Sequence, residues 1–182
     1  MSFCNTLRRT ALALVAAALA GLAAAATQAS VVMADEACPK AAMRIVVLGD
    51  SLADGLWGSL YRTYARCQTV ETLRLTTVSD GLAKTSAKGW LDRYYEARTN
   101  LDTRASDVVI VQIGANDITT IRDGTSRESF STPDWNQLYA ARVTQLTRGL
   151  RDRASKVIWF GLPVVGKSNL ETPYRTISTL QR

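Results

Sequence analysis

Histidine is absent from all 182 residues of the sequence. The chain therefore holds no imidazole that could act as the base of a Ser-His-Asp triad. Cysteine is scarce, with three residues, and the basic residues form no run or stripe despite a formal net charge of +6. We therefore expect no nucleic-acid partner. No internal repeat divides the chain, and its length suits one domain with a buried core.

The longest apolar run lies at the amino end, where an Ala/Leu-rich segment over residues 10–26 follows Arg8 and Arg9. A short basic stretch, an apolar run and small residues at a cleavage point are typical of a signal peptide. We predict a signal peptide and leader over residues 1–34, a domain over residues 35–182, and a periplasmic or secreted location. The alternative is an uncleaved anchor helix, but the run is only weakly hydrophobic for a membrane span. No stable membrane anchor is expected after cleavage.

Strand and helix patterns alternate along the rest of the chain. We predict strands over residues 43–48, 70–78, 107–113 and 156–160, and helices over residues 53–67, 88–98, 132–153 and from about residue 174. The polar stretch over residues 119–131 has no periodicity, so we predict a loop there. The alternation predicts an α/β domain with a parallel sheet, in which the third strand is central and the second lies nearer an edge.

Short segments rich in Gly, Ser, Asp and Asn follow the first three predicted strands. They are Gly49-Asp50-Ser51-Leu52, Val78-Ser79-Asp80-Gly81-Leu82 and Gly114-Ala115-Asn116-Asp117. Parallel strands bring their carboxyl ends to one edge of the sheet, where open α/β folds bind ligands. Ser51 would begin a helix at this edge, where backbone N–H groups and the helix dipole stabilise negative charge. Ordinary turn and helix-cap chemistry is the alternative explanation for each segment.

With these three segments in this order, the chain resembles the SGNH (GDSL) ester hydrolases over residues 44–163. It is most similar to a periplasmic bacterial branch of them with no assigned substrate. The resemblance implies a three-layer α/β/α sandwich of flavodoxin-like type. It also implies hydrolysis of a carboxylic ester through an acyl-serine intermediate, without metal or organic cofactor. The expected partner is a small-molecule or glycan ester, such as an O-acetylated envelope glycan.

The resemblance also assigns roles to individual residues. Ser51 would be the nucleophile, and the backbone N–H groups of Ser51 and Gly81, with the side-chain amide of Asn116, would form the oxyanion hole. Glycine allows close approach of the backbone, and an amide donates hydrogen bonds without carrying charge. The supporting residues are Asp50, Gly114 and Asp117. Of these, we expect Asp50 and Asp117 to order loops by accepting from backbone N–H groups.

The fourth block of these hydrolases, Asp-x-x-His, is missing from the sequence. On the resemblance, a C-terminal strand and the loop with the catalytic histidine would be missing too. We expect the chain to be a fragment, a truncated gene product or a domain that does not catalyse. The carboxylates of Asp50, Asp54 and Asp117 are expected to have ordinary pKa values of about 4, too low for efficient general-base catalysis at neutral pH. The alternative function is therefore a non-catalytic glycan-binding module.

Two cysteines remain after the leader, Cys38 and Cys67. The helix that ends near Cys67 returns antiparallel to the first strand, and Cys38 lies shortly before that strand. The two side chains should therefore meet at the end of the sheet opposite Ser51, in a compartment where disulfides persist. We predict a disulfide between them, and a buried free thiol at each position is the alternative.

A rival pattern, G-x-x-x-x-G-K-[ST], spans residues 161–168 after the fourth predicted strand. It matches the P-loop of nucleotide-binding proteins. Pro173 would fall in the second turn of the helix that a P-loop requires, where proline is costly. We therefore treat nucleotide binding as a remote alternative.

Overall fold

Four parallel strands form the central sheet of the computed structural model, in the order β2–β1–β3–β6. The strands are β1 Met43–Gly49, β2 Val70–Thr76, β3 Ser106–Gln112 and β6 Lys156–Trp159. The structure describes residues 38–99, 101 and 106–182, so the predicted leader over residues 1–34 lies outside the described residues. As predicted, β2 is at an edge of the sheet and β3 is internal.

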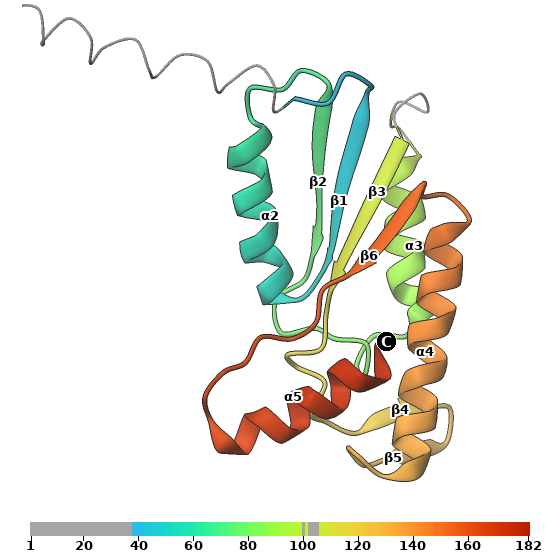
Figure 1. Ribbon diagram of the computed structural model, residues 1–182. Coiled ribbons are helices and arrows are strands. Elements are labelled where there is room, and N and C mark those ends of the chain that lie inside the picture. Colours follow the sequence, from blue (N-terminus) through green and yellow to red (C-terminus); the bar gives the residue numbers. More distant parts are fainter. Residues whose placement is uncertain (1–37, 100, 102–105) are drawn as a thin grey trace, which may run out of the picture. The chain divides into compact units, whose positions relative to one another are not determined.

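Helices cover both faces of the sheet, which confirms the predicted three-layer α/β/α fold (Figure 1). Helix α2, Ser51–Tyr64, packs on one face, while α3, Ala87–Arg98, and α4, Pro133–Arg151, pack on the other. No helix among residues 38–99 and 106–182 has the length and apolar character needed to cross a bilayer.

Alternate side chains of β1 serve the two sides of the sheet. Ile45 and Val47 pack with Ala53 of α2, whereas Val46 and Leu48 belong to the larger core beneath α3 and α4. A strand buried on both faces gives a continuous apolar run, which is why the sequence signal of β1 is strong.

Charged side chains join the amino ends of the strands, and two of them, Arg44 and Asp107, are buried. The guanidinium of Arg44 contacts Glu71 on β2 and Asp107 on β3, each at 2.8 Å. The hydroxyl of Tyr94 donates to Asp107 at 2.9 Å, so α3 is tied to the same carboxylate. Arg44 and Asp107 are both buried, and each has a second charged partner, Glu71 for Arg44 and Arg98 for Asp107.

The segment predicted as a loop over residues 119–131 contains a small antiparallel hairpin. Its strands are β4, Ile121–Asp123, and β5, Ser126–Glu128. The prediction was wrong because strands this short show no periodicity, and in β4 only Ile121 is buried.

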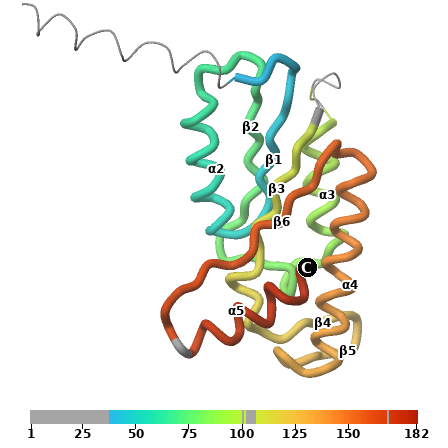
Figure 2. The backbone as a smooth tube through the Cα atoms, in the orientation of Figure 1, coloured from blue at the N-terminus to red at the C-terminus, as the bar shows by residue number. Residues whose placement is uncertain are grey.

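Helix α5 runs from Ser168 to Leu180 and begins earlier than predicted. Pro173 lies inside the helix, where it removes one backbone hydrogen bond without ending the element. Figure 2 shows the backbone leaving β6, passing the carboxyl ends of the strands and returning through α5 toward α4. Ile177 anchors α5 in the larger core and is fully buried.

Cys67 is buried in the turn that follows α2. Cys38 and Cys67 are both disulfide-bonded in the structure.

Candidate active site

Ser51 is the first residue of α2 and is exposed at the carboxyl edge of the sheet. Its hydroxyl has no hydrogen-bond partner among the residues that the structure describes. The turn before it needs glycine, because a Cβ on Gly49 would lie 1.8 Å from the carbonyl oxygen of Gln112 and the residue has φ +149°. Gly49 therefore lets β1 turn into α2 beside the end of β3.

Asp50 ties the serine turn to the segment after β3. Its Oδ1 accepts from the backbone N–H of Leu52 at 2.9 Å, which caps α2. Its Oδ2 accepts from the backbone N–H groups of Gly114 and Ala115 at 3.0 and 2.9 Å. Burial raises the pKa of the Asp50 carboxyl, and these N–H groups oppose the rise. The carboxylate thus orders two loops, as the sequence predicts.

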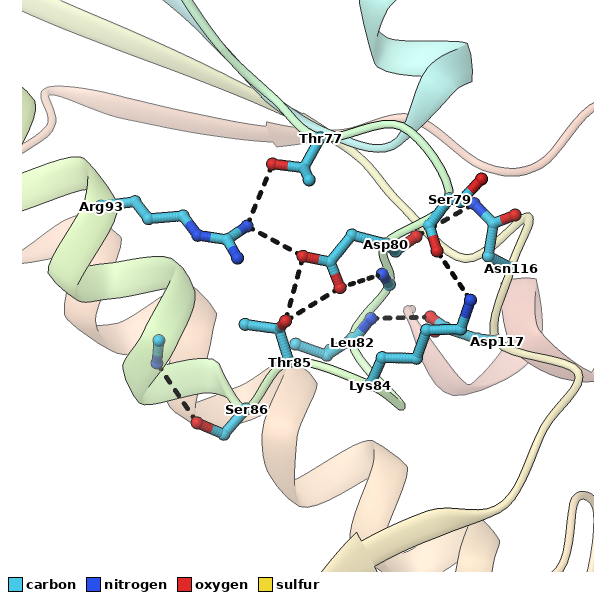
Figure 3. A network of polar contacts seen from close by, with 12 residues as sticks. Thr77, Ser79, Asp80, Leu82, Lys84, Thr85, Ser86, Arg93, Asn116 and Asp117 are labelled. Atoms are coloured by element: carbon cyan, nitrogen blue, oxygen red, sulfur yellow. Dashed lines mark hydrogen bonds and ion pairs between the residues drawn. The ribbon is translucent and has the colours of Figure 1, made fainter.

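Asn116 connects the segment after β3 to the segment after β2. Its Nδ2 donates to the backbone oxygen of Asp80 at 3.0 Å (Figure 3). A primary amide has two N–H groups, so one remains available for another acceptor.

The carboxylate of Asp80 lies at the centre of the network in Figure 3. It accepts from the backbone N–H of Gly81 at 2.8 Å, from the hydroxyl of Thr85 at 2.9 Å and from Arg93 at 3.0 Å. In this structure the Gly81 N–H expected to serve an oxyanion is therefore bonded to Asp80. Ser79, the residue before Asp80, has a backbone φ of 60°, which is uncommon for a residue other than glycine.

The carboxylate of Asp117 binds the segment that follows β2 through hydrogen bonds. Its two oxygens accept from the backbone N–H groups of Leu82 and Ala83 at 3.0 and 2.9 Å, and from the hydroxyl of Tyr139 at 2.8 Å. Gly81 packs so closely on this carboxylate that a Cβ would lie 2.0 Å from Oδ1. Burial raises the pKa of Asp117 to about 6.

The expectation that these carboxylates have ordinary pKa values was therefore wrong for Asp50 and Asp117. Both are buried, and sequence patterns do not report desolvation. Their acceptor atoms are nevertheless engaged by backbone N–H groups. Asp54 is also engaged, with Arg74 at 2.6 Å and the hydroxyl of Thr76 at 2.8 Å. No carboxylate among the described residues is hydrogen-bonded to the Ser51 hydroxyl.

The sequence did not identify Arg142, Tyr139 and Gln181 as side chains that support the segments after β2 and β3, directly or through Asp117. Arg142 of α4 donates to the backbone oxygens of Leu82 and Ala83 at 2.9 and 3.2 Å. The side-chain amide of Gln181 donates to Tyr139 at 3.1 Å and to the backbone oxygen of Ile113 at 2.7 Å. These contacts join residues far apart in the chain, and no local spacing could have revealed them.

We call Ser51, Gly81 and Asn116, with the segments that contain them, the serine edge. Asp50 accepts from the backbone N–H groups of the segment after β3, and Asn116 of that segment donates to the backbone oxygen of Asp80, so hydrogen bonds join all three segments. Chemically, the serine edge offers a free hydroxyl and amide donors at the N-terminus of a helix.

In the rival P-loop segment, α5 begins directly after Lys167. However, the backbone N–H of Leu162 points to the hydroxyl of Ser178 on α5, at 3.3 Å. A phosphate-binding loop needs its N–H groups directed at the ligand.

A family model described as "Protein of unknown function (DUF459)" matches residues 44–182. The matched stretch includes every residue of the serine edge. None of the curated proteins compared with the chain matches it.

Proposed function

The chain belongs to the DUF459 family, and we propose that its serine edge forms an acyl-serine intermediate from a carboxylic ester, as the SGNH (GDSL) hydrolases do. The observation that supports this proposal best is the joining of the segments after β1, β2 and β3 through Asp50, Asp80 and Asn116. The hydroxyl of Ser51 is exposed and not hydrogen-bonded to this network, at the N-terminus of α2.

In the proposed reaction the Ser51 hydroxyl loses its proton to solvent water as its oxygen attacks the carbonyl carbon of the ester. The carbonyl electron pair moves to oxygen, and the resulting oxyanion accepts from the N–H of Ser51 and from the free amide hydrogen of Asn116. Collapse of this intermediate breaks the bond to the alcohol oxygen, which takes a proton from solvent, and leaves an acyl-serine. Water then attacks the acyl carbon in the second half-reaction, which releases the carboxylic acid and restores the Ser51 hydroxyl.

The third proposed donor, the N–H of Gly81, has to leave the Asp80 carboxylate before it can bind an oxyanion. Thr85 and Arg93 provide other partners for that carboxylate, so it stays hydrogen-bonded when the Gly81 N–H turns away. Each such donor typically contributes about 3 kcal/mol to the transition state.

The absence of histidine sets the rate that this proposal predicts for the 182-residue chain. The Ser51 proton has no imidazole acceptor, so both acylation and the attack of water lose general-base catalysis. An oxyanion hole and binding alone leave a residual acceleration of about 10³ to 10⁴-fold in proteases where the triad has been removed. We therefore propose slow acylation, still slower deacylation and negligible steady turnover.

The experiment is to incubate the chain with p-nitrophenyl acetate and map acetylated residues by mass spectrometry. The proposal predicts an acetyl group on Ser51 that forms faster than on Ser59, an exposed serine on the same helix. Ser51→Ala should lose the fast adduct, and Ser59→Ala should keep it. Equal acetylation of the two serines would contradict the proposal.

A non-catalytic module that binds glycan is the second candidate function. It is favoured by the missing histidine and by the engagement of Gly81 and Asn116 with Asp80. In such a module, p-nitrophenyl acetate would acetylate Ser51 no faster than Ser59. In either case we propose an exported protein whose ligand is an ester or glycan of the envelope.

A further inference from the structure

A cavity of about 390 Å³ lies between the segment that follows β6 and helix α5. Trp159 and Leu162 contribute an apolar wall, and α5 contributes Glu171, Tyr174 and Arg175. This volume suits one or two sugar rings, at the lower end of the usual range of about 300 to 1,000 Å³ for small-molecule sites.

The cavity adjoins the serine edge. The hydroxyl of Tyr174 donates to the backbone oxygen of Ala115 at 3.4 Å. A Cβ on Gly114 would contact Gln181 at 3.1 Å and Leu162 at 3.4 Å, and both residues line the cavity. The segment over residues 114–115 therefore contacts both Asp50, the residue before Ser51, and the wall of the cavity.

Two acceptors in the cavity wall are buried without a hydrogen-bond partner among the described residues. They are Oε2 of Glu171 and Oε1 of Gln181. Gln181 is only 9% exposed, and its amide nitrogen is already bonded to Ile113 and Tyr139. Unpaired buried acceptors are unfavourable, and a ligand with O–H donors would satisfy them.

The charged side chains that line the cavity disfavour charged ligands. Glu171 disfavours an anion, whereas Arg175 and Arg182 disfavour a cation. Arg175 bonds Oε1 of Glu171 at 3.3 Å and is largely exposed, so it can also donate to a ligand oxygen. A long acyl chain would bury these polar groups without pairing them. A neutral ring with several hydroxyls supplies both donors and acceptors, and its C–H face can pack on Trp159 and Leu162.

We propose that this cavity binds a neutral sugar ring. The site is new relative to the serine edge, and its role as the subsite for the alcohol part of an ester rests on the proposed function. Glu171 and Gln181 accept from sugar hydroxyls, and Arg175 donates to a ring or hydroxyl oxygen.

The test is a ¹H–¹⁵N NMR titration of the 182-residue chain carrying Ser51→Ala, which lacks the proposed nucleophile. The sugar probes are methyl β-D-glucopyranoside and N-acetylglucosamine, and the charged probes are inorganic phosphate and ethylammonium. We expect saturable shifts at α5 and residues 161–164 with at least one sugar and none with the charged probes. No saturable shift with either sugar, or tighter binding of a charged probe, would overturn the proposal.

Variants of α5 then locate the binding. Glu171→Ala and Arg175→Ala should each weaken sugar binding by about 10-fold, whereas Thr172→Ala, on a neighbouring residue outside the cavity, should not. If Glu171→Ala fails to fold, Glu171→Gln keeps the side-chain size while replacing one acceptor oxygen by a donor. Unchanged affinity in the folded variants would refute this site.

The result is separable from the proposed reaction. Sugar binding without fast acetylation of Ser51 in the wild-type chain would support the cavity and contradict the acyl-serine proposal. Fast acetylation of Ser51 without sugar binding would refute the cavity alone.

Discussion

At the scale of single residues, Asp117 shows how burial changes a side chain that the sequence marks only as a turn acid. Its carboxylate is fully buried, and backbone N–H groups and the Tyr139 hydroxyl only partly offset the loss of water. The pKa is therefore raised to about 6, and the nearby Asp50 carboxylate contributes to the rise. Because its oxygens already hold the segment over residues 82–83, Asp117 positions that segment rather than serving Ser51 as a base.

The raised pKa of Asp117 predicts a pH-dependent stability. Between its ordinary value of 3.8 and about 6, the folded protein binds a proton that the unfolded chain has released. This stabilisation is complete below pH 3.8 and is lost as the pH rises through about 6. Relative to Asp117→Asn, which does not titrate, the wild-type free energy of unfolding should fall by up to about 3 kcal/mol across this window. Urea unfolding at a series of pH values measures the difference, and parallel profiles for the two proteins would contradict it.

Gly81 offers a second test at this scale. A Cβ there would lie 2.0 Å from Asp117 Oδ1, so Gly81→Ala has to displace a buried carboxylate that holds two N–H groups. We expect a loss of about 1 to 3 kcal/mol in the free energy of unfolding, as is usual for overpacking. Gly55→Ala is the matched control, because nothing lies within 4 Å of its Cβ position in α2. The control should gain about 0.5 to 1 kcal/mol from helix propensity. Equal effects of the two substitutions would refute the packing argument.

At the scale of elements, helices and strands with a strong apolar pattern can be predicted from the sequence. Helices and strands that depend mainly on tertiary contacts cannot. The strands β1 and β3 and the helix α4 lie close to their predicted bounds. The hairpin β4–β5 has no pattern of its own, since most of its residues are exposed. In α5, Pro173 suggests a helix boundary, but the buried Ile177 and the side-chain contacts of Gln181 stabilise the helix around it.

The docking of α5 at the serine edge depends on Ile177, which is fully buried and would meet a Cβ of Gly114 at 2.9 Å. Ile177→Ala should therefore cost about 2 to 5 kcal/mol and increase amide exchange in residues 113–115. Leu170→Ala, at a partly exposed position of the same helix outside the buried cores, should cost about 1 kcal/mol. Chemical denaturation and hydrogen exchange measure both effects. Similar losses from the two variants would show that α5 has no specific role in supporting the site.

At the scale of the whole molecule, parallel topology made the candidate site predictable. Gly, Ser, Asp and Asn residues that follow buried parallel strands have to gather at one edge, and the segments of Ser51, Gly81 and Asn116 do so. The hydrogen bond from the Gly81 N–H to the Asp80 carboxylate and the support from Tyr139 and Gln181 were not predictable. Gln181 contacts Ile113 across 68 residues of sequence, and only the packed fold brings such positions together.

The predicted disulfide would also affect the stability of the whole folded chain. A bridge between Cys38 and Cys67 closes a loop of about 30 residues, which should stabilise the fold by roughly 3 to 4 kcal/mol in the chain-entropy model. Mass spectrometry after alkylation of unreduced protein from an oxidising compartment should find neither thiol modified. Thermal unfolding with and without reductant then measures the contribution. Two alkylated thiols in the unreduced protein would contradict the pairing.

The central claim is that Ser51 and Asn116 act together on an ester carbonyl. The measurement that tests it most directly is the rate of Ser51 acetylation by p-nitrophenyl acetate in the wild-type chain and in Asn116→Ala, with Ser59 as the internal reference. We expect Asn116→Ala to slow acetylation of Ser51 by about 10²-fold, as for other oxyanion donors, and to leave acetylation of Ser59 unchanged. If Ser51 is acetylated no faster than Ser59 in the wild-type chain, the joint action of Ser51 and Asn116 is contradicted. The same holds if Asn116→Ala leaves the acetylation rate of Ser51 unchanged.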